Sequence, residues 1–210
     1  MVDHPVLEKI RNENPTLLPM IVLTLKRAHE EALAMITSSR MASRFWQEAF
    51  PQVLYPAVQQ SILEMVEMLG KDEIEGKREL NAQKNHSHAE ITLPWAVITV
   101  HALAENEQHP RKCVYRDKLS VEQFDFFDVI DGDMKSERSY FAIIHKRNKI
   151  TNMLEDVRLI SMNAKGEAGG ISVSIMEESF PCEIVSKTGV VVVKEETIDQ
   201  VNRPRLKRAK

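Results

Sequence analysis

The spacing of hydrophobic residues changes near residue 70, and this change limits the available folds more than any other feature of the sequence. Between Thr16 and Gly70 apolar residues recur every three or four positions, which places them on one face of an α-helix. From Ile91 onward they occur in short runs rich in valine and isoleucine that are separated by turn-forming residues, as is typical of β-strands. Helices followed by strands predict an α+β fold.

The first part of the chain predicts two helices that pack as an antiparallel pair. The first helix is expected to begin after the N-cap Thr16, to tolerate Pro19 in its first turn and to end near Arg40. Its apolar stripe comprises Leu18, Ile21, Val22, Leu25, His29, Ala32, Leu33 and Ile36, so His29 is interpreted as a hydrogen-bonded core or boundary histidine. The second helical region runs from Ser43 to a C-cap at Gly70, and we expect Pro51 and Pro56 to cut it.

The second part predicts a mostly antiparallel β-sheet with one inserted helix. The strands are expected within 91–103, 113–119, 139–149, 154–163, 171–176, 183–186 and 190–195, and the helix within 120–133. The polar segment 71–90 is expected to be a linker or a surface helix. The predicted organisation is a helical region 1–80, a β-rich α+β domain 90–198 and a flexible basic tail 199–210, with a single compact domain 1–198 as the alternative.

Composition and charge favour a cytoplasmic protein with an acidic body. No run of apolar residues is long enough to span a membrane, the N-terminus lacks the pattern of a signal peptide, and Cys113 and Cys182 are the only cysteines. The last nine residues carry five cations and no acid, whereas residues 1–201 carry 23 basic against 31 acidic residues. Nucleic-acid binding would therefore depend on the tail or on local patches.

One predicted strand ends in a run of cations, which we call the cationic run: His145, Lys146, Arg147 and Lys149. Because side chains alternate along a strand, His145 and Arg147 should face one side and Lys146 the other. The run is either a phosphate-contacting surface or the solvated end of a strand that nearby acids neutralise. The candidate nucleic-acid-binding residues are the cationic run and four tail residues: Arg203, Arg205, Lys207 and Arg208.

An acidic cluster precedes this strand and offers a second interpretation. Asp128, Asp131 and Asp133 come before the strand that carries Lys146, and carboxylates beside a lysine can hold Mg²⁺ and assist an attacking water. This order resembles that of the PD-(D/E)xK nucleases over about twenty residues. The sequence departs from that family because Ile144 stands where the family has an acid. The cluster also fits the loop at the end of a helix.

The remaining candidate chemistry is weaker. His86, His88, His101, His109 and Cys113 lie close in sequence, and an H-x-H pair in a strand can bind zinc, but the spacing matches no established ligand pattern. There is no G-x-S-x-G, P-loop or G-x-G-x-x-G motif. We therefore predict no metal, no cofactor and no catalytic residue.

These features together predict a non-enzymatic interaction protein of bacterial or phage origin. It is expected to contact nucleic acid through its basic patches and to use its helices for a protein partner or a homo-oligomer, without membrane association. The helices are rich in methionine, whose flexible side chain suits adaptable interfaces: Met20, Met35, Met41, Met65 and Met68. The alternative is a Mg²⁺-dependent nuclease that uses Asp128, Asp131 or Asp133 with Lys146.

Overall fold

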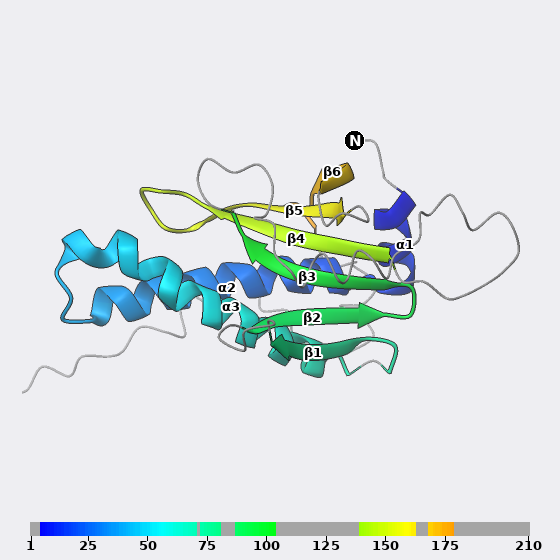
Figure 1. Cartoon of the computed structure of the whole chain (residues 1–210), viewed down its shortest axis with the longest axis horizontal. Helices are drawn as coiled ribbons and strands as arrows, with labels where there is room; N and C mark the ends of the chain where they lie inside the picture. The colour runs from blue at the N-terminus through cyan, green and yellow to red at the C-terminus, as the bar shows by residue number, and fades with distance from the viewer. Residues whose placement is uncertain (1–4, 71, 81–86, 104–138, 163–167, 179–210) are drawn as a thin grey trace, which may run out of the picture. The chain divides into compact units, whose positions relative to one another are not determined.

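The computed structural model describes residues 5–70, 72–80, 87–103, 139–162 and 168–178. Three α-helices and a short 3₁₀ helix, η1, come first: α1 (Pro5–Glu13), α2 (Leu17–Ser38), η1 (Ser43–Phe45) and α3 (Trp46–Leu69). Six strands follow: β1 (Glu75–Leu80), β2 (Ser87–Leu93), β3 (Ala96–Ala102), β4 (Ser139–Arg147), β5 (Leu154–Met162) and β6 (Ala168–Ser174) (Figure 1). The predicted α+β class is confirmed. All described helices precede the sheet, and the helix expected within 120–133 lies outside the described residues.

The six strands form one sheet in the order in which they occur along the chain. All neighbours are antiparallel except β3 and β4, which are parallel, with Ala96 opposite Ser139 and Ala102 opposite His145. A run of hairpins cannot produce that parallel pair, because two parallel strands need a crossover connection. The predicted strands at 113–119, 183–186 and 190–195 lie outside the described residues.

Strand β1 lies in the segment that we expected to be a linker or a surface helix, so that expectation was wrong. Its residues pair with β2 from Glu75 opposite Thr92 to Leu80 opposite Ser87. Nearly all of β1 is exposed, as an edge strand can be, and it therefore carries no apolar alternation. The strand was missed because its pairing comes from backbone hydrogen bonds rather than from a buried face.

Helices α2 and α3 lie side by side on one face of the sheet (Figure 1). The apolar stripe of α2 packs with Ile62 and Met65 of α3 and with the inward residues Ile91, Ile98 and Ile143 of the sheet. The described helices and strands thus share a hydrophobic core and belong to one compact unit. A smaller apolar cluster lies on the opposite face of β4 and β5, formed by Tyr140, Ala142, Ile144, Ile160 and Met162.

The ends of the two long helices agree with the sequence, but the course of α3 does not. Helix α2 begins directly after Thr16, and α3 ends at Gly70, whose φ of 56° is the left-handed C-cap conformation. Pro51 and Pro56 lie inside α3 without ending it, so the expected break was wrong. Both prolines are exposed, whereas Phe50, Leu54 and Val58 on the other side of the helix are buried in the core, and this packing holds the helix together.

Within the described part of the chain, none of the helices has the length and apolar character needed to cross a membrane.

Candidate functional site

The cationic run does not form a single patch, because its members separate at the end of β4. His145 faces the helices and is buried, Arg147 lies on the same side between the sheet and α3, and Lys146 lies on the opposite face. The Nζ of Lys146 is 3.8 Å from the Glu155 carboxylate, and both side chains are about half exposed. The strand alternation therefore separates His145 and Arg147 from Lys146 as expected, and Glu155 partly neutralises Lys146.

His145 forms a buried pair with His29 of α2. The Nε2 of His29 is 3.1 Å from the Nδ1 of His145, and the Nδ1 of His29 is 3.2 Å from the backbone carbonyl oxygen of Asn152. The interpretation of His29 as a hydrogen-bonded core histidine is confirmed.

The direction of these hydrogen bonds follows from the carbonyl group. A carbonyl oxygen only accepts, so the Nδ1 of His29 carries the proton and its Nε2 is the acceptor in the neutral ring. The Nδ1 of His145 must then donate to it. The remaining nitrogen, Nε2 of His145, is an unprotonated acceptor.

Both histidines are kept neutral at ordinary pH. Burial, with a smaller contribution from His29, lowers the pKa of His145 to about 3. Burial also lowers the pKa of His29, and the charge of Arg147 acts in the same direction, while the hydrogen bond to Asn152 opposes them. Neither ring is open to solvent, so the pair supports the fold rather than presenting a catalytic base to a substrate.

Arg147 continues this network from the histidines to α3. Its Nη1 donates to the Oδ1 of Asn152 at 2.5 Å and to the Oε1 of Gln47 at 3.2 Å, and its guanidinium lies 5.2 Å from the centre of the Phe50 ring. Gln47 in turn donates to the carbonyl oxygen of Lys149 at 3.0 Å. These contacts fasten the β4–β5 turn to the start of α3, and the described partners of Arg147 are all uncharged.

The β4–β5 turn has its own internal support. Asn152 adopts a left-handed φ of 59°, which asparagine tolerates better than most residues. The Oδ1 of Asn148 accepts from the backbone N–H groups of Ile150 and Thr151. The turn is therefore a defined structure that holds Lys149 and Ile150 outward.

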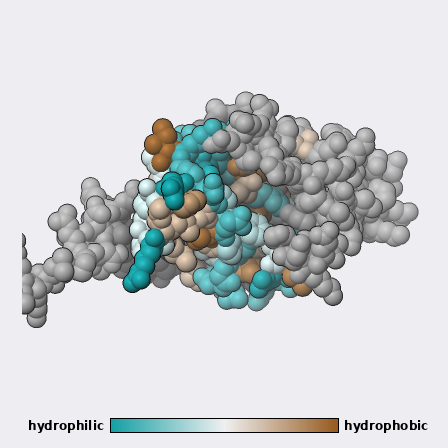
Figure 2. Space-filling model, turned by 60° about the vertical axis from the view of Figure 1, so that its left-hand side comes forward, coloured by the Kyte–Doolittle hydropathy of each residue, from teal (hydrophilic) through white to brown (hydrophobic). Residues whose placement is uncertain are grey.

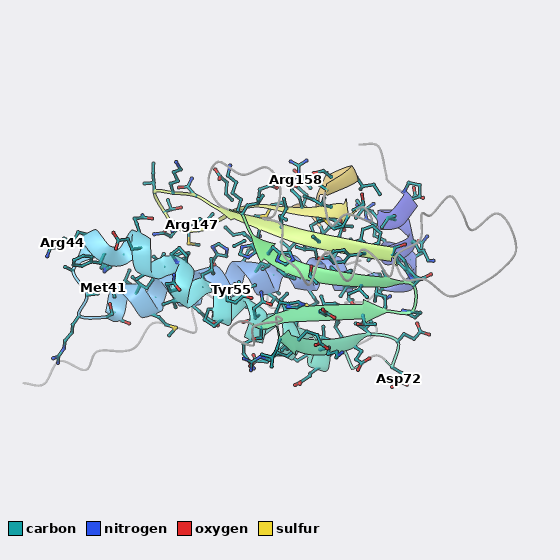
Figure 3. The ribbon with its side chains drawn as sticks, in the orientation of Figure 1. Met41, Arg44, Tyr55, Asp72, Arg147 and Arg158 are labelled. Carbon is teal, nitrogen blue, oxygen red and sulfur yellow. The ribbon has the colours of Figure 1, made fainter. Side chains whose placement is uncertain are left out.

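Figure 1 shows the loop between α2 and α3 and the β4–β5 turn at the same end of the sheet, and we call the exposed side chains there the distal surface. It comprises Met35, Arg40, Met41, Arg44, Phe45, Lys149 and Ile150. Its four large apolar side chains are well exposed: Met35 by 61%, Met41 by 42%, Phe45 by 43% and Ile150 by 88%. Met41 and Arg44 are labelled at the end of the helical pair in Figure 3, and Figure 2 brings this end forward, with hydrophobic atoms among hydrophilic ones.

The sheet face away from the helices carries further polar side chains that are buried or, for His101, half-buried. The Nε2 of His88 is 2.8 Å from the Oε1 of Glu90, and the Thr99 hydroxyl is 2.7 Å from the Nε2 of His101 and 2.8 Å from the Tyr140 hydroxyl. These polar groups are hydrogen-bonded to one another, as buried polar groups generally are. In the described ranges, no three histidine, cysteine, aspartate or glutamate side chains form a group that could hold a metal.

Several candidate residues lie outside the described residues. These are the acids Asp128, Asp131 and Asp133, the tail residues Arg203, Arg205, Lys207 and Arg208, and His86, His109 and Cys113.

Sequence reasoning missed two residues that organise this end of the molecule, Gln47 and Asn152. Asn152 follows Asn148 closely between two predicted strands, and this pattern is a usable turn signal. Gln47 has no such signal, since its role depends on where the β4–β5 turn lies in space.

The chain matches no protein-family model, no curated protein and no solved structure in our comparisons.

Proposed function

We propose that this chain is a non-enzymatic interaction protein that binds a protein partner through the distal surface. The observation that carries the proposal is the concentration of four exposed large apolar side chains at one end of the described structure. Single exposed apolar residues are ordinary, whereas a group of them beside polar residues is characteristic of interaction sites. Methionine, phenylalanine and arginine are also residue types that are enriched at protein interfaces.

The backbone beneath these side chains is held in place, which favours binding. The indole Nε1 of Trp46 donates to the carbonyl oxygen of Met41 at 3.1 Å, and η1 gives the loop a regular turn before α3. Gln47 connects the same region to Lys149. A surface that is ordered before binding loses less conformational entropy when a partner docks.

The buried polar groups favour binding over catalysis. In the described part of the chain, His29, His88 and His145 are buried and hydrogen-bonded, and His101 is half-buried and hydrogen-bonded to Thr99. A general acid or base must reach its substrate, and His29 and His145 cannot.

Nucleic acid is a second candidate ligand, and the cations Arg40, Arg44 and Lys149 on the distal surface favour it. Fluorescence polarisation with mixed-sequence DNA and RNA at several salt concentrations would measure such binding. The nuclease alternative with Asp128, Asp131, Asp133 and Lys146 stays a prediction. Release of cleaved oligonucleotide only when Mg²⁺ is present would support it.

The docking proposal can be tested by site-specific photo-cross-linking. A photoreactive amino acid is placed at Met41, Phe45 or Ile150, and at the exposed control positions Met68 and Leu80, in an extract of the source cells. We expect one protein to cross-link from the three distal positions and not from the two controls. That protein is then purified and titrated against the wild-type chain and a Met41→Ser, Phe45→Ser variant.

The variant should bind the purified partner at least about tenfold more weakly, because truncating a central aromatic anchor commonly costs this much. Both substituted side chains are exposed, so thermal unfolding should change little and a folding defect is readily recognised. Equal cross-linking from the distal and control positions, or unchanged affinity of the variant, would contradict the proposal.

A further inference from the structure

Resting on the proposed function, we infer that the partner is a different protein that presents an acidic segment with large apolar side chains. The distal surface combines exposed apolar groups with a local positive charge, and both properties have to be matched by whatever covers it.

The positive charge of the surface comes mainly from arginines. Residues 35–47 contain Arg40 and Arg44 and no aspartate or glutamate, and Arg147 donates to Gln47 at the same end of the structure. Arg44 lies over the Phe45 ring at 4.8 Å, and Arg147 bonds to the neutral groups of Gln47 and Asn152. None of these described contacts removes charge, so the surface keeps a positive potential.

The rest of the chain is acidic, which sets it apart from the distal surface. Residues 1–201 carry an excess of eight acidic residues, although the distal surface is basic. An approaching acidic segment is therefore attracted to this end of the molecule and repelled from the acidic rest of it, which orients the encounter.

A symmetric dimer of this chain is a poor occupant of the same surface. A two-fold interface would bring Arg40 and Arg44 of one copy against the same arginines of the other, and like charges at close range oppose association. Nucleic acid would satisfy the charge but would leave Met35, Met41 and Ile150 without apolar partners. Phosphate contacts are made mainly by cationic and polar groups, and stacking on bases needs aromatic rings. The apolar side chains therefore favour a protein segment.

The experiment is a selection from a phage-displayed library of random peptides against the full chain. The wild-type protein is compared with Arg40→Glu, Arg44→Glu, which reverses the charge, and with Met41→Ser, Phe45→Ser, which removes apolar groups. We expect the wild type to enrich peptides rich in aspartate, glutamate and large apolar residues. The acidic bias should disappear with the charge-reversed variant, and the apolar bias with the serine variant.

A selected peptide is then titrated against all three proteins at physiological salt. We expect the charge reversal to weaken binding by about tenfold or more. A single exposed ion pair is modest, but here two side chains change sign together and turn attraction into repulsion. Unfolding curves of the variants check that the fold is intact.

Three results would overturn the inference, and they separate it from the docking proposal. Peptides that need Met41 and Phe45 but are not acidic would overturn the partner class and leave the docking surface in place. Peptides that bind all three proteins equally would overturn both. Mixed-sequence DNA or RNA that binds the wild type more tightly than the selected peptide, and loses affinity on charge reversal, would reassign the surface to nucleic acid.

Discussion

The buried pair of His29 and His145 makes the stability of the fold depend on pH. The folded-state pKa of His145 is about 3, whereas the unfolded chain has the ordinary value near 6.5. Between these values the unfolded state binds a proton that the folded state does not, so stability falls as the pH falls. His29 has a lowered pKa and acts in the same direction.

We therefore expect the free energy of unfolding to decrease below about pH 6.5, by up to about 1.4 kcal/mol per pH unit for each histidine. Urea denaturation between about pH 7 and pH 4 measures this slope. His145→Gln removes one titrating ring and should make the slope shallower. An identical slope in wild type and variant would show that the pair is not the source.

Arg147 is expected to matter more to stability than its neighbour Lys146. Arg147→Met leaves the Oδ1 of Asn152 and the Oε1 of Gln47 without this donor, and we expect a loss of about 1–3 kcal/mol. Lys146→Met is the matched control, because its half-exposed pair with Glu155 should contribute less than about 1 kcal/mol. Chemical denaturation compares the two variants. Equal losses would mean that the Arg147 network does not hold the turn.

At the scale of elements, Pro56 is a residue inside α3 that disfavours the helical conformation. Pro56 is exposed and lacks the backbone N–H that an interior helical residue would donate. Pro56→Ala should therefore stabilise the protein by about 1–3 kcal/mol, reduced by the greater freedom of the unfolded chain. Gln52→Ala, at another exposed position of α3, controls for a general effect of alanine. A destabilised Pro56→Ala variant would indicate that the proline shapes α3 for packing.

A second contact between elements explains why β1 contains a glycine. A Cβ added to Gly76 would lie 3.1 Å from the Cβ of Val66 and 3.2 Å from its Cγ1, and valine cannot easily move aside. Gly76→Ala should destabilise the protein by about 1–3 kcal/mol through overpacking. Val66→Ala in the same chain should make the Gly76 substitution less harmful, which a double-mutant cycle of denaturation curves measures. Additive losses would contradict a direct clash.

The elements that could be predicted are those in which the spacing of apolar residues shows which face is buried. The apolar stripe of α2 predicted that helix, and Gly70 predicted the end of α3. Strand β1 could not be found this way, because an exposed edge strand has no buried face. The parallel pairing of β3 with β4 could not be predicted either, because the direction of pairing depends on the path of the chain between the two strands.

At the scale of the whole molecule, the candidate site was only partly predictable for a related reason. Alternation along β4 correctly separated His145 and Arg147 from Lys146. It could not show that α2 would cover His145, because that contact joins residues 116 positions apart. The distal surface likewise combines two loops that only the assembled fold brings to one end.

The shared core predicts that the described helices and strands unfold as one unit. Leu25 of α2 is fully buried in the same apolar cluster as Ile98 of β3 and Ile143 of β4. Leu25→Ala should lower the free energy of unfolding by about 2–5 kcal/mol through loss of packing and formation of a cavity. Because the core is common, the loss should affect the helices and the sheet equally.

Two probes that weight these parts differently can follow unfolding in a Trp46→Phe background. Circular dichroism reports mainly on the helices, and fluorescence reports on Trp95, which packs against Phe141 of β4 and also contacts Lys9 and Glu13 of α1. We expect the two denaturation curves to coincide in this background and to shift together when Leu25→Ala is added. Curves that separate, with the helical signal lost first, would instead support a helical region 1–80 that unfolds independently of the β-rich domain 90–198.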